Sequence, residues 1–243
     1  MAEAGRWDGR PVTVCHRGAS ALAPENTRRA FELAIEGGAD MAELDVYLSA
    51  DGELVVSHDE DLRRLTGRAA TVGELTAAEL ARLNLGAGQG VPRLTEVFEL
   101  ARGRLGIYVE LKGEGTGRAL GELVRAGGAD GIDLIGGSFE QRLVAELRAT
   151  EPSVPRCVLF RPTTLEDMLA VASTLGLAYV HPCFRRPDGR LDPPVDRPLV
   201  DALHAAGLKV MTNHTNDAAE ARYFASIGVD VIASDDPRVL AQL

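Results

Sequence analysis

Short apolar runs rich in β-branched residues recur eight times along this chain, and segments with a helical pattern separate them. The runs are VTVC (12–15), AELDVYL (42–48), GIYVEL (106–111), IDLIG (132–136), RCVLF (156–160), AYVH (178–181), LKVMT (208–212) and DVIAS (230–234). Parallel strands need crossover connections, which helices usually provide. The pattern therefore predicts an α/β fold, a (β/α)₈ TIM barrel, with an open doubly wound sheet as the alternative.

One connection is much longer than the others. Residues 49–94, between the second and third runs, exceed the length of one crossover helix and contain a further apolar run, ELVVS at 53–57. We interpret that run as an extension of the second strand, and the remainder as an insertion over the barrel mouth. The stretch RRPDGRLDPPVDRP (185–198) predicts a smaller loop before the seventh strand. A chain of 243 residues suits a single barrel domain over 1–243.

Composition limits the possible partners. The longest apolar run is far too short to cross a bilayer, and a net charge of −10 argues against nucleic acid or an anionic membrane as partner. The first residues contain no apolar signal segment, so we expect a cytoplasmic protein that acts on a small molecule. Cys15, Cys157 and Cys183 lack paired spacing and are expected to be reduced and mostly buried. The sequence makes no prediction of oligomeric state.

Two acids interrupt the second apolar run. Glu43 and Asp45 share one face of the predicted strand, because side chains alternate with a period of two, whereas Leu44 and Val46 take the other face. Taken alone, such acids are also typical of a solvated edge strand. In the third run Glu110 and Lys112 share a face in the same way. Three acids close together would repel one another unless a cation joins them, so a site for Mg²⁺ or Ca²⁺ is the favoured interpretation.

Other polar residues follow the ends of the predicted strands, where TIM-barrel active sites lie. They are His16, Arg17, His58, Ser138, Asn213, His214 and Asp235. His16 and His58 are candidate general acid and base, although a lone histidine is more often structural. His181 and His204 are weaker candidates, because neither has an evident partner. Arg17 offers a planar fork for phosphate oxygens.

The segment APENT (23–27) has the pattern of a helix start. Pro24 stiffens the approach, and Asn26 or Thr27 can cap the first turn. Capping alone explains the motif, but Glu25 and Asn26 could also reach into the site. The glycines of NLGAGQG (84–90) have neither a Rossmann nor a P-loop spacing and are assigned to turns.

Several motifs together resemble the glycerophosphodiester phosphodiesterase family. They are CHRGAS, PENT, ELDVYLSADGELVVSHDEDLRRLTG, PRLTEV, VELK and GVDVIASDDP, and they extend from His16 to Pro237 in the family's order. The resemblance implies a metal-dependent phosphodiesterase on a (β/α)₈ barrel. It also implies roles by position: Glu43, Asp45 and Glu110 bind one divalent cation, His16 and His58 are the acid/base pair, and Arg17 and Lys112 hold phosphate oxygens.

The family resemblance also implies a reaction. The substrate's own glycerol hydroxyl attacks phosphorus, a cyclic phosphate forms, and water opens it to give glycerol 3-phosphate and an alcohol. This agrees with the residues themselves, which include two histidines but no evident protein nucleophile. The alternatives are a phosphodiesterase or phospholipase D-like enzyme for another polar head group, and a non-catalytic barrel that binds a phosphorylated ligand. Retention of both histidines and all three acids argues against the binding barrel.

The chain departs from the family at one motif. Members usually carry Trp-Thr-x-Asn after the seventh strand, whereas this chain has Asn213 and His214 at the first two positions and keeps Asn216. Two hydrogen-bonding side chains thus replace an aromatic wall. We expect Asn213 and His214 to contact the substrate, and its alcohol to be more polar than, or different from, plain glycerol.

Overall fold

The computed structural model describes residues 9–184 and 195–243. Eight parallel strands form a barrel in the order β8, β7, β6, β5, β4, β2, β1, β9, and a bridge from Met211 to Val231 joins its two ends. The (β/α)₈ barrel is therefore confirmed, and the open doubly wound sheet is wrong. The strands are β1 (Val12–Cys15), β2 (Met41–Leu48), β4 (Gly106–Leu111), β5 (Leu134–Ser138), β6 (Arg156–Phe160), β7 (Tyr179–Pro182), β8 (Lys209–Val210) and β9 (Val231–Ser234).

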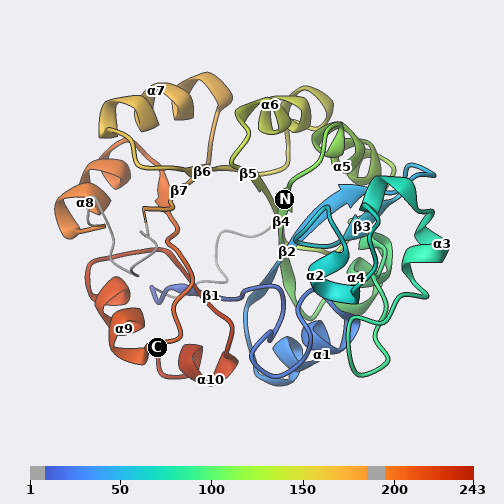
Figure 1. Cartoon of the computed structure of the whole chain (residues 1–243). Helices are drawn as coiled ribbons and strands as arrows, with labels where there is room; N and C mark the ends of the chain where they lie inside the picture. The colour runs from blue at the N-terminus through green and yellow to red at the C-terminus, as the bar shows by residue number, and fades with distance from the viewer. Residues whose placement is uncertain (1–8, 185–194) are drawn as a thin grey trace.

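Helices surround the barrel and connect its strands (Figure 1). They are α1 (Arg28–Glu36), α4 (Leu94–Ala101), α5 (Thr116–Arg125), α6 (Gln141–Thr150), α7 (Leu165–Leu175), α8 (Arg197–Ala205), α9 (Ala218–Ser226) and α10 (Pro237–Leu240). Most of the predicted loop at 185–198 lies outside the described residues. Its described end leads into α8, where Asp196 caps the helix.

The long connection after β2 contains β3 (Leu54–Val56), α2 (Arg63–Thr66), the 3₁₀ turn η1 (Val72–Glu74) and α3 (Ala77–Leu80). β3 pairs antiparallel with β2, so residues 53–57 do not extend that strand in its own direction, and that interpretation is wrong. The chain reverses at Asp51 and Gly52, where Gly52 has a positive φ of 80°. An Asp-Gly pair is a frequent hairpin turn. The side chains of Val55, Leu62, Val72 and Leu80 form a small core beneath this insertion.

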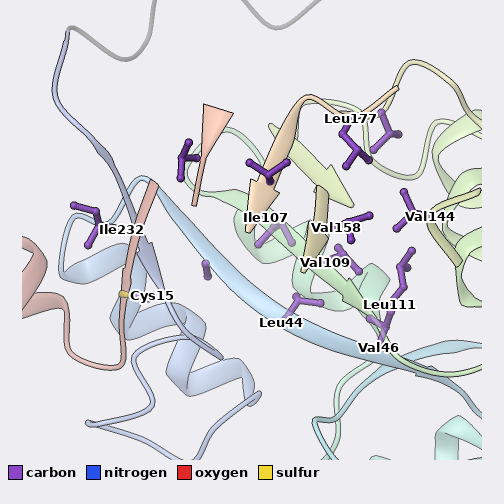
Figure 2. Close-up of a cluster of buried hydrophobic side chains, with 14 of the residues drawn as sticks. Cys15, Leu44, Val46, Ile107, Val109, Leu111, Val144, Val158, Leu177 and Ile232 are labelled. Atoms are coloured by element: carbon purple, nitrogen blue, oxygen red, sulfur yellow. The ribbon is translucent and has the colours of Figure 1, made fainter. Parts of the chain in front are cut away.

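Alternation along the strands separates two apolar layers. Leu44 and Val46 of β2 face outward with Ile107, Val109 and Leu111 of β4, and they pack against the surrounding helices (Figure 2). A second layer fills the barrel interior and consists of Val12, Val14, Met41, Tyr108, Ile135, Cys157, Leu159, Met211 and Val231. The inward parity of Met41 places Glu43 and Asp45, two and four residues later, at the carboxyl end of the same face.

Candidate active site

A cavity of about 190 Å³ opens at the carboxyl ends of the barrel strands. Its polar lining comprises His16, Arg17, Glu43, His58, Tyr108, Glu110, Lys112, His181, Thr212, Asn213 and His214. The apolar part of the lining includes Val14, Leu159, Met211 and Val231. Of the residues to which the sequence analysis gives a catalytic, metal-binding, phosphate-binding or substrate-binding role, all but Asp45 line this cavity, and Asp45 is buried beside Glu110 and Lys112.

Three carboxylates meet beside this cavity. The parallel register of β2 and β4 sets Asp45 opposite Glu110 and Glu43 opposite Tyr108. Glu43, Asp45 and Glu110 are 5%, 1% and 8% exposed, and one oxygen of each lies within 4.8 Å of the others. A group of buried oxygen donors of this kind is able to hold a hard divalent cation.

Two cationic side chains partly compensate these charges. The Lys112 ammonium lies 3.0 Å from Glu110 Oε1 and 3.3 Å from Asp45 Oδ1, and Arg17 Nε lies 3.6 Å from Asp45 Oδ2. The Asn26 amide donates a hydrogen bond of 2.9 Å to Asp45 Oδ2. Asp45 is thus the best-compensated acid of the three, and Asn26 belongs to the site.

The APENT segment serves both of the roles considered for it. Thr27 caps α1 by accepting a hydrogen bond from the Ala30 amide, while Asn26 turns toward Asp45. Asn26 and Arg17 have φ angles of 57° and 55°, a left-handed conformation that is uncommon outside glycine. The bend at Arg17 directs its main-chain N–H to Glu43 Oε2, at 2.9 Å. This local backbone therefore orients two of the three acids.

Burial and neighbouring charges give the three carboxyl groups different pKa values. Desolvation, with Asp45 and Glu110 nearby, raises the pKa of Glu43 well above its usual range. Desolvation and Asp45 raise the pKa of Glu110 to about 7, against the opposing effect of Lys112. Burial alone would raise the pKa of Asp45 too, but Lys112, His58 and Arg17 outweigh it and lower that pKa. Lys112 and Arg17 thus neutralise the charge of Asp45 well. They neutralise the charges of Glu43 and Glu110 only in part.

Uncompensated negative charge of this kind is a feature of sites that bind a metal cation. Oε1 of Glu43 is buried and has no hydrogen-bond partner among the described residues. An uncompensated buried carboxylate oxygen is costly unless it is protonated, hydrogen-bonded or bound to a cation. The three acids therefore fit one divalent cation as a donor set.

His16 is oriented by a carboxylate from the other end of the chain. Its Nδ1 lies 2.7 Å from Asp235 Oδ1, and Nε2 is left facing the acids, 4.0 Å from Glu43 Oε2. Ser20 and Asn216 also donate hydrogen bonds to Asp235. His214 stacks on His16 with ring centroids 4.0 Å apart and an interplanar angle of 10°. His214, the replacement for the family threonine, thus contacts a candidate catalytic group directly.

His58 lies in the insertion and is also oriented by an aspartate. Its Nδ1 lies 2.7 Å from Asp59 Oδ1, and Asp59 pairs with Arg64 of α2. Arg64 reaches Glu25 at 2.7 Å, and Glu25 in turn accepts a bond of 3.1 Å from Arg17. Desolvation lowers the pKa of His58, against the effect of Asp45. A chain of charged contacts therefore connects the insertion to Arg17.

The structure also revises the weaker candidates. His204 lies on α8, away from the cavity, and is bonded to Asp230 at 2.8 Å. His181 lines the cavity, although the sequence gave it no partner. The sequence pattern does not indicate roles for Asp59, Arg64 and Tyr108, and it indicates Asp235 only by its position after a strand. Ser138 has a structural role, since its hydroxyl donates to the Leu111 carbonyl.

The fold and the site together define a TIM-barrel enzyme with titratable side chains at its mouth. The family model of glycerophosphoryl diester phosphodiesterases matches residues 16–239. The chain belongs to this family and is a phosphoric diester hydrolase that acts on glycerophosphodiesters.

Relatives match along nearly the whole chain. A glycerophosphodiester phosphodiesterase of Caldanaerobacter subterraneus is 30% identical, and the alignment covers 96% of this chain and 97% of that protein. A crystal structure of the Agrobacterium tumefaciens glycerophosphodiester phosphodiesterase is 32% identical with a TM-score of 0.78, covering 95% and 99% of the two chains. An Oleispira antarctica phosphodiesterase in complex with its product sn-glycerol-3-phosphate is 27% identical with a TM-score of 0.84, covering 96% of each chain.

Within residues 9–184 and 195–243, none of the helices is long and apolar enough to span a bilayer.

Proposed function

We propose that the protein hydrolyses glycerophosphodiesters with His16 and His58 as its acid/base pair and one divalent cation, Mg²⁺ or Ca²⁺, on Glu43, Asp45 and Glu110. The observation that carries the proposal is the convergence of these three buried carboxylates beside a cavity lined by both histidines. When bound, the cation would stabilise negative charge that develops on phosphorus oxygens.

The two histidines suit opposite proton transfers. Each has Nδ1 against an aspartate, so the imidazole is fixed in orientation and Nε2 is available for the substrate. In the first step the glycerol hydroxyl next to the phosphoester forms a bond to phosphorus and gives its proton to one histidine. The other histidine protonates the departing alcohol oxygen as its bond to phosphorus breaks. The product of this step is a cyclic glycerol phosphate.

The second step reverses these roles. Water attacks phosphorus, gives its proton to the histidine that had acted as acid, and the ring oxygen leaves with the proton stored on the other histidine. Glycerol 3-phosphate results, and both histidines return to their starting states. The cavity therefore needs no protein nucleophile.

Arg17 and Lys112 are proposed to hold the phosphate oxygens. Both line the cavity, with side chains 19% and 18% exposed. Asn213 and His214 also line the cavity and are proposed to contact the alcohol part of the substrate. We further propose that the protein is a cytoplasmic enzyme of glycerol and lipid metabolism, because glycerophosphodiesters are water-soluble and glycerol 3-phosphate is their hydrolysis product.

A substrate panel tests the activity. Purified protein is incubated with Mg²⁺ or Ca²⁺ and with glycerophosphocholine, glycerophosphoethanolamine, glycerophosphoinositol or a lysophospholipid, and released glycerol 3-phosphate is measured. Turnover of the water-soluble diesters is expected. Preference for the lysophospholipid would instead support the phospholipase D-like alternative, for which the described residues offer little, since their exposed large apolar side chains are Leu22 and Tyr223. No turnover of any diester would support the binding barrel.

A further inference from the structure

A second group of metal-ligating side chains includes a residue at which this chain departs from the family motif. The group consists of His16, His214 and Asp235, and one ligand atom of each lies within 4.8 Å of the others. His16 follows β1, His214 lies four residues after the end of β8, and Asp235 follows β9. These elements are different from β2 and β4, which carry the three carboxylates. The two groups of ligands are therefore separate sets of side chains.

Asp235 is the centre of the second group. Its Oδ1 lies 2.7 Å from His16 Nδ1, and its Oδ2 lies 3.9 Å from His214 Nε2. Asn216 and Ser20 donate hydrogen bonds of 2.7 and 3.1 Å to this carboxylate. Burial would raise the pKa of Asp235, but the hydrogen bonds of His16 and Asn216 outweigh it and lower that pKa. The carboxylate is thus ionised and held in one orientation by its neighbours, as carboxylates that bind metals usually are.

His214 supplies the second nitrogen. Its ring is stacked on the His16 ring at an interplanar angle of 10°, so a nitrogen of each ring lies beside the same carboxylate. The lone pairs of these nitrogens lie in nearly parallel planes, and a shared cation requires one ring to turn. The side chain of His214 is 41% exposed and that of His16 is 18% exposed. His214 is therefore the ring with room to turn toward Asp235.

The two groups of ligands differ in the cation that they suit. The three carboxylates offer only oxygen donors, which Mg²⁺ and Ca²⁺ prefer. Two imidazole nitrogens and one carboxylate are instead typical ligands of Zn²⁺ and of related transition metals. With the threonine that the family motif usually has at position 214, the second group would contain a single nitrogen donor. His214 thus gives this chain a ligand set that the usual motif does not have.

We propose that His16, His214 and Asp235 bind Zn²⁺ and that this binding inhibits the enzyme, at a site separate from that of the activating cation. Zn²⁺ takes Nδ1 of His16 in place of the hydrogen bond to Asp235. The proton on Nδ1 is displaced, and the neutral ring then carries its single proton on Nε2, the nitrogen that faces the three acids. No lone pair remains on the ring to accept a proton from a hydroxyl group or from water.

Each proposed histidine accepts a proton in one of the two reaction steps, so a His16 that cannot accept one stops turnover. The inhibitory effect therefore rests on the proposed function, because it needs His16 in proton transfer. Binding of Zn²⁺ does not depend on that function, because it needs only the three ligands and their positions.

A direct titration tests the site without an assay of turnover. Protein treated with EDTA and then freed of chelator is titrated calorimetrically with Zn²⁺ in buffer that contains excess Mg²⁺. Co²⁺ is used in a parallel titration, because its visible absorption reports nitrogen ligands. The wild type should bind one Zn²⁺ under these conditions. His214→Thr should weaken this binding by about 100-fold or more, since loss of a residue that merely supports a metal ligand already costs about 10- to 100-fold.

His204→Ala is the matched control. It also removes a histidine that contacts an aspartate, with Nε2 2.8 Å from Asp230 Oδ2, but on α8 away from the cavity. It should leave the Zn²⁺ affinity unchanged. Glu110→Gln separates the two cation sites and should retain Zn²⁺ binding. Binding that survives His214→Thr but is lost in Glu110→Gln would place Zn²⁺ among the three carboxylates and overturn the inference. Absence of Zn²⁺ binding by the wild type would also overturn it.

Inhibition kinetics connect binding to activity. With glycerophosphocholine and excess Mg²⁺, Zn²⁺ should inhibit the wild type, and His214→Thr should raise the half-inhibitory concentration by the same factor by which it weakens binding. Zn²⁺ binding through His214 without inhibition would overturn the inhibitory role. Turnover of diesters by a protein that binds no Zn²⁺ would refute this inference alone. Zn²⁺ binding through His214 in a protein that hydrolyses no diester would support the site and refute the proposed function.

Discussion

At the scale of single residues, orientation distinguishes the two cavity histidines from the histidine on α8. His16 and His58 each have Nδ1 held at 2.7 Å by an aspartate and are partly exposed toward the cavity. His204 makes a similar contact with Asp230, but on the outer surface. A carboxylate partner alone is therefore no sign of catalysis, and it is the position at the barrel mouth that gives His16 and His58 their proposed role.

Replacing His58 tests this role. His58→Ala should lower kcat for glycerophosphocholine by about 10²- to 10⁴-fold, the usual contribution of a general acid or base. Steady-state kinetics measures the effect, and circular dichroism checks that the fold is kept. His204→Ala is the control and should retain wild-type kcat. Normal turnover by His58→Ala would remove His58 from the proton transfers.

The sequence identifies those site residues whose placement depends only on their neighbours along the chain. Glu43 and Asp45 could be assigned to one strand face because alternation depends only on neighbouring residues. The partner of His16 could not be assigned in this way, because Asp235 is 219 positions away and is brought close by the pairing of β1 with β9. The sequence does not reveal the position of His181 for the same reason, since most residues that line the cavity with it come from other strands.

At the scale of elements, the ion pairs of Arg64 in α2 connect the insertion to the barrel. This side chain contacts Asp59, which holds His58, and Glu25, which contacts Arg17. The insertion thus positions one proposed catalytic group from outside the barrel. Its hairpin turn has a sequence signal in the Asp51-Gly52 pair. The apolar run that follows, however, has a pattern that is equally typical of a continuing strand.

Replacing Arg64 should lower kcat only slightly. Arg64 is 51% exposed, so its ion pairs contribute about 1 kcal/mol or less. Arg64→Ala should therefore lower kcat by up to about fivefold. The neighbouring Arg63→Ala, which removes a 3.7 Å contact with Asp61, should leave the rate unchanged. Equal rates for wild type and Arg64→Ala would show that Asp59 holds His58 unaided.

Asp40 joins the starts of β1 and β2. Its carboxylate accepts hydrogen bonds from the Thr13 amide and hydroxyl, at 2.9 and 2.8 Å, and from Arg10. Burial would raise the pKa of Asp40, but the bonds to Arg10 and Thr13 outweigh it and lower that pKa. A depressed folded-state pKa adds stability above the unfolded-state pKa of about 4, and this stability is lost as the pH falls through the folded-state value.

The free energy of unfolding at two pH values tests whether Asp40 stabilises the contact between β1 and β2. Asp40→Asn should lower the free energy of unfolding by about 1 to 2 kcal/mol at pH 7, and by less at pH 3, where the wild-type carboxyl has lost part of its advantage. Urea titrations measure both values. Asp201→Asn, at an exposed position on α8, should change neither. A loss that is the same at both pH values would contradict the assigned role of the ionised carboxylate.

At the scale of the whole molecule, the barrel concentrates charge at one end of an apolar interior. The inner layer of Val12, Val14, Met41 and Ile135 lies below three buried acids, and the strand register that forms the barrel also sets the distances among those acids. The alternating pattern of the chain was sufficient to predict this architecture. The closure of the barrel was not evident, because β8 has two residues and meets β9 through a single bridge at Met211.

The most direct test of the account is the metal dependence of diester hydrolysis. Wild-type protein is treated with EDTA, freed of chelator, and assayed with glycerophosphocholine before and after addition of Mg²⁺ or Ca²⁺, with release of glycerol 3-phosphate as the readout. The chelated protein should be inactive while still folded, and at least one of the two ions should restore its activity. Full activity of the chelated protein would contradict the assignment of Glu43, Asp45 and Glu110 as a catalytic metal site.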